Sequence, residues 1–199
     1  MEKLLDSEKK SKGLTLIEML AAVTIFVIAV VAVSGIIISG IRSQRRVLAT
    51  QEILDQASYV MEYMGRTLRM AKKELNCPGP QCCLTTSGNG YNYEGSGDNI
   101  TFIDYQDNCT EFFLDTTMGT GQLKKKDIMS GIISELTSPK ITVNSFLVDI
   151  SGEAQPLTDF LQPRVTLFLE LLGRESMGQP KIQIQTSISQ RALDVEYVP

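Results

Sequence analysis

The stretch KGLTLIEMLAAVTIFVIAVVAVSGIIISGI, residues 12–41, determines how the rest of the chain is organised. Between Leu14 and Ile41 the only charged side chain is that of Glu18. The uncharged part, from Met19 to Ile41, has 23 residues. At about 1.5 Å per residue, a helix of this length spans roughly 35 Å, enough to cross a hydrocarbon core of about 30 Å. The sequence therefore predicts a membrane-spanning helix near its beginning.

Three simpler interpretations explain this stretch less well. A secretory signal peptide has a much shorter apolar region and ends in a cleavage site with small residues. A plain membrane anchor explains the length but gives no role to Gly13 or Glu18. A buried core helix would not follow a basic segment such as residues 9–12. A carboxylate near one end of an apolar helix is costly without a partner, so Glu18 is a functional candidate.

Residues 12–18 resemble the N-terminus of type IV prepilins and the related pseudopilins. In that family a short basic leader ends in Gly, and an apolar residue, Thr or Ser, Leu, Ile or Val, and Glu follow. Here Lys12 and Gly13 end the leader, and Leu14 stands where Phe is more usual. The resemblance implies cleavage after Gly13 by a prepilin peptidase and N-methylation of Leu14. It also implies that the helix packs with other pilin or pseudopilin subunits in a filament.

Glu18 has a specific expected role in that assembly. Cleavage creates a positive amine on Leu14, four residues from the Glu18 carboxylate. When helices pack in a staggered bundle, an incoming amine either meets a carboxylate or lies unpaired among apolar side chains, which is unfavourable. We therefore expect Glu18 to pair with the Leu14 amine of a neighbouring subunit and to set its axial register. The alternatives are a carboxylate that reaches the lipid headgroups or one that pairs within its own chain.

The helix is expected to continue to residue 75, and residues 42–75 form its amphipathic half. No Pro occurs in this range, whereas Pro78 and Pro80 follow it closely. Seven apolar residues recur at spacings of three or four: Ile53, Ala57, Val60, Met64, Leu68, Ala71 and Leu75. Such a stripe covers a globular domain on one side. The predicted organisation is a leader at 1–13, a membrane and filament-core half at 14–41, the amphipathic half at 42–75, and a globular domain at 76–199.

The globular domain is expected to be rich in β-strands. Its first part, residues 76–98, is a Gly-, Ser- and Asn-rich connector, and residues 127–136 fit either a short helix or coil. We predict an α+β fold in which the long helix packs on the buried face of an antiparallel sheet. The closing stretch, residues 184–191, also resembles the C-terminal strand of larger minor pilins of the J or W type. The predicted strands are 99–105, 110–115, 120–126, 140–150 with a bulge near Ser145, 165–171 and 182–189.

The four cysteines, Cys77, Cys82, Cys83 and Cys109, all follow the membrane segment. In an exported domain an even number of cysteines predicts disulfides. A zinc site fits less well because paired Cys-x-x-Cys motifs are missing and adjacent cysteines are awkward tetrahedral ligands; free thiols are the remaining alternative. A ring joining Cys82 to Cys83 would be strained. We therefore expect Cys109 to pair with one of these two and Cys77 with the other.

Two polar clusters receive structural interpretations. Asp98, Asp104, Asp107, Asn108 and Asp115 crowd the first predicted hairpin, but EF-hand spacing is missing. We interpret them as turn residues and predict no metal site. The run at 124–126 is three lysines, which we interpret as a solvated strand edge; contact with a receptor or a surface is the alternative.

Composition favours a structural role over catalysis. The chain has no His, the commonest general base and metal ligand, so we predict no enzyme and no cofactor. Its net charge of -4 gives no electrostatic footprint for nucleic acid. We predict a minor pilin or pseudopilin of a type IV pilus, a type II secretion pseudopilus or a competence filament. It would cross the cytoplasmic membrane once, with its domain exported, and then join a cell-surface or periplasmic filament. The alternative is a membrane-tethered extracellular binding domain that does not assemble.

Overall fold

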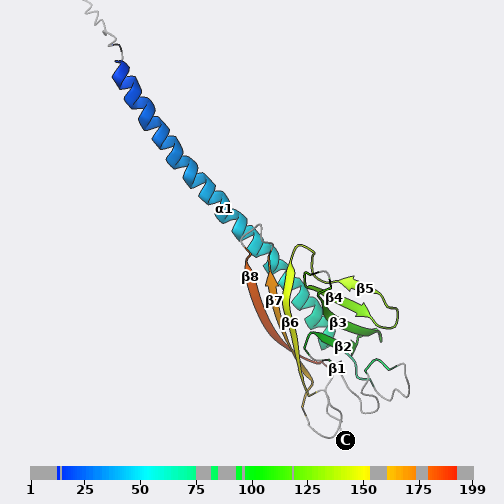
Figure 1. The fold of residues 1–199 in the computed structure, drawn as a ribbon. Coiled ribbons are helices and arrows are strands. Elements are labelled where there is room, and N and C mark those ends of the chain that lie inside the picture. Colours follow the sequence, from blue (N-terminus) through cyan, green and yellow to red (C-terminus); the bar gives the residue numbers. More distant parts are fainter. Residues whose placement is uncertain are drawn as a thin grey trace, which may run out of the picture. The chain divides into compact units, whose positions relative to one another are not determined.

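The computed structural model describes residues 13, 15–74, 82–84, 93–95, 97–117, 119–152, 161–173 and 179–191. The chain divides into two compact units, residues 1–45 and 46–199. Helix α1, Leu16–Arg69, contributes to both units, and eight strands follow it along the chain in the described residues (Figure 1). The predicted leader before Gly13, and Leu14 itself, lie outside the described residues.

In the first unit, the helix is apolar on all sides from Met19 to Ile41 and exposed along its whole length. Leu16 is 84% exposed, Phe26 68% and Ile36 74%. Every described residue from Gly13 to residue 45 is exposed. Within the described residues, α1 is the helix that is long and apolar enough to cross a membrane. Such a surface needs contact with lipid or with other apolar helices.

The strands of the second unit form two antiparallel sheets. One has five strands in the order β1-β2-β3-β4-β5, and the other has three in the order β6-β7-β8 (Figure 1). The predicted α+β class is therefore confirmed, whereas the expectation of one sheet is wrong. The bounds are β1 Tyr93–Glu94, β2 Asn99–Ile103, β3 Cys109–Asp115, β4 Gln122–Asp127, β5 Ile133–Glu135, β6 Thr142–Ser151, β7 Arg164–Leu172 and β8 Lys181–Ser189.

Backbone contacts of β6 join the two sheets. The N–H of Val143 donates to the Gly121 carbonyl at 2.8 Å, and the N–H of Val148 donates to the Gly97 carbonyl at 2.8 Å. A Cβ on Gly121 would collide with the carbonyl oxygen of Val143. The outer edge of β6 thus bonds to two loop glycines instead of a further strand, which is why the sheet divides here.

The predicted stripe on α1 faces the core. All its described members, Ile53, Ala57, Val60, Met64, Leu68 and Ala71, are at most 3% exposed, and Leu75 lies outside the described residues. They share one hydrophobic cluster with buried residues of both sheets, such as Phe112 of β3 and Leu167 of β7. The stripe is confirmed over its described length.

Helix α1 ends at Arg69, six residues before the predicted end. The N–H of Lys72 donates to the Ile103 carbonyl at 2.9 Å, in a bridge to β2, and the N–H of Arg191 donates to the Arg69 carbonyl at 2.8 Å. These contacts take the backbone groups that another helical turn would need. Tertiary hydrogen bonding therefore overrides the helix propensity of residues 70–74.

Two buried side chains also serve the end of the helix. The Tyr93 hydroxyl donates to the Leu68 carbonyl at 2.7 Å. The Gln190 amide donates to the Ala71 carbonyl at 2.6 Å. The last carbonyls of a helix lack the donor that a further turn would supply. The Tyr93 hydroxyl is a second donor to the Leu68 carbonyl, which also accepts the N–H of Ala71, and the Gln190 amide is a donor to the Ala71 carbonyl just beyond the helix.

The predicted bulge near Ser145 is confirmed, because the β6–β7 register shifts between Val143 and Ser145. The extra residue, Asn144, donates its side-chain amide to Glu170 of β7, a carboxylate that is 6% exposed. Gln183 and Lys181 of β8 also donate to this carboxylate. The hydrogen bonds from Gln183 and Lys181 lower the pKa of Glu170 below its usual value. Glu170 therefore connects all three strands of this sheet.

Candidate processing and assembly site

The helix begins immediately after the predicted cleavage position. Gly13 is exposed, and Leu16 is the first helical residue. The N–H of Glu18 donates to the hydroxyl of Thr15 at 3.3 Å, and the Thr15 carbonyl accepts the N–H groups of Glu18 and Met19 at 3.1 and 3.2 Å. Thr15 is therefore the N-cap. This role was not predicted, although the Thr-x-x-Glu spacing is that of a capping box.

The carboxylate of Glu18 is the exceptional group of this segment. It lies in the first turn of α1, where the partial positive charge of the helix N-terminus favours an anion. Its side chain is exposed and makes no hydrogen bond or ion pair with any residue in the described part of the chain. The capping box is thus only half formed, and the carboxylate is accessible to a partner. Leu14 lies outside the described residues, so its cleavage, its methylation and its pairing with Glu18 remain predictions.

Two hydroxyl groups further along the apolar segment differ from Glu18. The Thr24 hydroxyl donates to the Ala21 carbonyl at 2.8 Å, and the Ser34 hydroxyl donates to the Val30 carbonyl at 2.8 Å. Bonds to the helix's own backbone satisfy polar groups without water, which is how they are accommodated in lipid. Glu18 differs from these two hydroxyls because it is charged and has no partner in the described residues.

A model of the prokaryotic N-terminal methylation motif matches residues 9–34, which include Gly13, Leu14 and Glu18. The chain carries a type IV prepilin-like signal. No curated protein and no solved structure matches the chain. The signal points to a type IV pilin-like, structural protein, and it implies processing by a prepilin peptidase and assembly with other pilins. Together with the apolar part of α1, it suits a single-pass membrane protein.

Disulfide bonding fastens residues 82–84, a described part of the connector. Cys83 and Cys109 form a disulfide with a Cα–Cα distance of 5.4 Å. Cys82 is also disulfide-bonded, whereas Cys77 lies outside the described residues. The Glu74 carboxylate accepts the N–H groups of Cys83 and Leu84 at 2.8 and 2.7 Å. These bonds fix residues 82–84 to β3 and to the segment that follows α1.

Asp104 of the first hairpin acts in a turn, as predicted. Asp104, 3% exposed, accepts the N–H groups of Gln106 and Asn108 at 2.8 and 2.9 Å. Asp107 forms an ion pair with Lys72 at 2.7 Å. Within the described residues, no three His, Cys, Asp or Glu side chains are arranged to hold a metal ion.

The interpretation of residues 124–126 as a strand edge is wrong. Residues 133–135 form β5, so the lysines lie on β4 between β3 and β5. Lys124 is paired with Asp115 at 2.6 Å, and both side chains are less than one-fifth exposed. Hydrogen bonding by Lys124 is the main cause that lowers the pKa of Asp115. The ammonium of Lys125 donates to the Tyr63 hydroxyl at 3.3 Å.

Proposed function

We propose that this type IV pilin-like protein is a structural subunit, a minor pilin or pseudopilin, of a type IV pilus, type II secretion pseudopilus or competence filament. The observation that carries the proposal is the methylation motif at residues 9–34, which leads directly into an exposed apolar helix. Lipid would cover this helix before assembly, and the helices of neighbouring subunits would cover it afterwards. The globular domain would be exported and would reach the cell surface or periplasm in the filament.

Glu18 gives the assembly its register. In the described residues its carboxylate has no partner, and in an apolar helix bundle an unpaired charge is strongly unfavourable. A Leu14 amine from a neighbouring subunit supplies the opposite charge. Only one axial offset brings the two groups together, so the pair selects that offset over others.

The processing step is tested by intact mass. Gly13 and Thr15 precede the first helical residue, which favours access by a peptidase because their backbone is not yet part of the helix. The native protein should begin at Leu14 and carry one added methyl group. Full-length protein recovered from cells with an active prepilin peptidase would contradict this.

The assembly step is tested with Glu18→Gln, which keeps the side-chain shape and removes the charge. Membrane insertion and cleavage should persist, and incorporation into sheared filaments should fall by about tenfold or more, because about 1.4 kcal/mol per subunit already gives that factor. Glu52→Gln is the matched control. Its carboxylate faces Lys140 at 3.6 Å with both side chains well exposed, so incorporation should be unchanged.

Normal incorporation of the Glu18 variant would contradict the pairing role. The alternative function, a membrane-tethered binding domain, predicts a different outcome. The protein would be cleaved and methylated but would not appear in sheared filaments, and it would not be recovered with other pilin subunits after crosslinking.

A further inference from the structure

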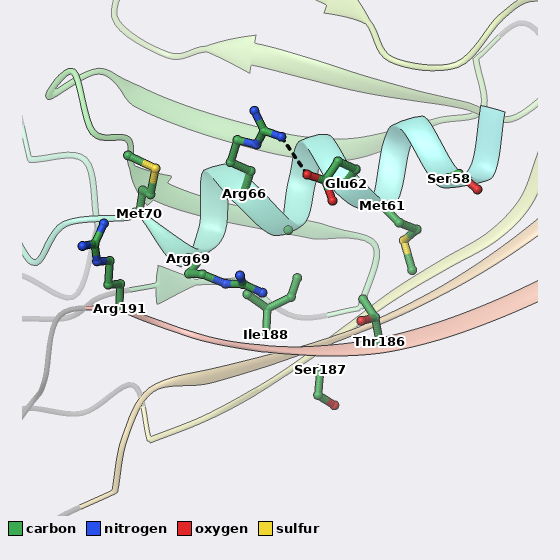
Figure 2. Close-up of a pocket in the computed structure, with 11 residues that line it drawn as sticks. Ser58, Met61, Glu62, Arg66, Arg69, Met70, Thr186, Ser187, Ile188 and Arg191 are labelled. Carbon is green, nitrogen blue, oxygen red and sulfur yellow. Dashed lines mark hydrogen bonds and ion pairs between the residues drawn. The ribbon is translucent and has the colours of Figure 1, made fainter. Parts of the chain in front are cut away.

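A groove of about 430 Å³ lies between the end of α1 and strand β8 (Figure 2). From the helix, Ser58, Gly65, Arg66 and Arg69 contribute to its lining. Their spacing places them along one side of α1, next to the buried stripe. Residues 186–188 of β8 form the opposite wall.

The groove follows the edge of β8. Successive side chains of a strand point to opposite faces, and in Figure 2 Thr186 and Ile188 point towards the helix whereas Ser187 points away. A groove lined by all three therefore runs along the strand's edge. β8 is the outer strand of its sheet, and within the described chain no backbone hydrogen bond reaches its other edge. Its nine residues thus offer unpaired backbone donors and acceptors.

The groove is positively charged. Arg66 is paired with Glu62 at 2.7 Å. Arg69 and Arg191 are exposed, and their guanidinium groups have no ion pair with any residue that the structure describes. The bond from the Arg191 N–H to the Arg69 carbonyl holds these two residues together. A chain of net charge -4 therefore places two unpaired arginines beside one groove.

Gly65 keeps the side of the groove open. A Gly inside a helix costs about 1 kcal/mol relative to Ala. A Cβ on Gly65 would meet only Ile188, at 3.8 Å, an ordinary contact. Packing therefore does not require Gly at this position. Its effect is to leave space between the helix and β8.

We propose that this groove binds an extended, acidic segment of a partner polypeptide, which adds to β8 as a further strand. The free edge of β8 supplies main-chain hydrogen bonds, as in other cases of strand addition. Arg69 and Arg191 supply charge-assisted bonds to carboxylates. Alternate residues of a strand lie about 7 Å apart on one side, so carboxylates at every second position face the arginines together. The backbone edge favours a polypeptide over a small anion.

The probe is a fluorescent peptide, TEVETEV, compared with its neutral counterpart TQVQTQV. The protein is the full chain in detergent micelles. Fluorescence anisotropy measures binding, and hydrogen exchange of residues 181–189 reports strand addition. We expect TEVETEV to bind at least about tenfold more tightly than TQVQTQV, to weaken with added salt, and to slow exchange in β8.

Variants test the geometry. Arg69→Gln with Arg191→Gln should weaken TEVETEV binding by about tenfold or more. Arg164→Gln is the matched control, because Arg164 is an exposed arginine of β7 that does not line the groove; it should leave binding unchanged. Gly65→Leu should block the groove, whereas Gly65→Ala should bind the peptide and unfold at a higher temperature than the wild type. Exchange of β3 amides checks that each variant is folded.

Three results would overturn the proposal. Equal affinity for the two peptides would show that the charges of the arginines do not contribute to binding. Unchanged hydrogen exchange in β8 on peptide binding would show that the peptide does not pair with the edge of this strand. Slower exchange in β8 with increasing protein concentration, without peptide, would show that the edge pairs with a second copy instead. None of these measurements requires filament assembly, so the proposal and the proposed function fail independently.

Discussion

Tyr93→Phe tests how the domain terminates α1. The substitution keeps the ring, which is 1% exposed, and removes only the hydroxyl that donates to the Leu68 carbonyl at 2.7 Å. Burial raises the pKa of the Tyr93 hydroxyl well above its usual value. The group is therefore a protonated donor at every pH at which the protein is studied.

The expected loss of stability depends on the hydrogen bonds that the Leu68 carbonyl keeps in the variant. This oxygen also accepts the N–H of Ala71 at 3.1 Å, so the substitution leaves it with one partner. The full penalty for an unsatisfied buried group, about 1–3 kcal/mol, therefore does not apply. The expected loss is the net value of a neutral hydrogen bond, about 1 kcal/mol, or a fall of about 2–4 °C in the unfolding midpoint for a domain of this size.

The assay is thermal and urea unfolding of the full chain in micelles, followed by tyrosine fluorescence, which no Trp obscures because the chain has none. Hydrogen exchange at Ala71 and Lys72 should accelerate in the variant. Tyr105→Phe is the control, because that side chain is 53% exposed and its loss should change stability by less than about 0.5 kcal/mol. A loss above about 3 kcal/mol, or equal losses in both variants, would refute the reasoning.

Three other perturbations have defined outcomes. Met64→Ala, at a fully buried position of the stripe, should cost about 2–5 kcal/mol in urea unfolding, and a smaller loss would mean that the helix does not pack there. The lowered pKa of Glu170, whose largest cause is the hydrogen bond from Gln183, gives stability that is present near neutral pH and is lost as the pH falls below the usual value of 4.5 and through the lower folded value. Glu170→Gln should therefore make the free energy of unfolding fall less steeply as the pH is lowered. Parallel pH profiles of the wild type and the variant would argue against this role. Replacing both Cys83 and Cys109 by Ser opens a bridge with a sequence separation of 26; the loss should be at most about 3.5 kcal/mol, and reducing agent should then no longer affect this pair.

Local patterns in the sequence predicted α1 and six strands, β2, β3, β4, β6, β7 and β8. Strand β1 was not predicted, and β5 lies within residues 127–136, which were expected to be a short helix or coil. The spacing of Ile53 to Ala71 shows which side of the helix is covered, because helical periodicity depends only on residue type. Alternating apolar residues identified β7 in the same way. All four of them, Val165, Leu167, Leu169 and Leu171, are buried. The assembly signal was also readable, because its residues are contiguous.

Features that depend on distant residues could not be predicted. The end of α1 is determined by Ile103 and Arg191, which only the folded chain brings to it. Alternation identifies strands but not their partners, so the division into two sheets was missed. The arginine groove was missed for the same reason, because Arg69 and Arg191 are neighbours only in space.

Gly121 has a consequence for how this sequence can diverge. The two sheets approach there backbone to backbone, and any other amino acid would bring a Cβ into the Val143 carbonyl oxygen. A lineage can exchange surface charges or remodel loops one mutation at a time, but every single step away from Gly at position 121 forces the sheets apart. Compensation would require a shift of β6 itself, which also carries the bulge and the bond to Glu170. Related chains that keep this arrangement of sheets should therefore retain Gly at this position after most of their surface has changed.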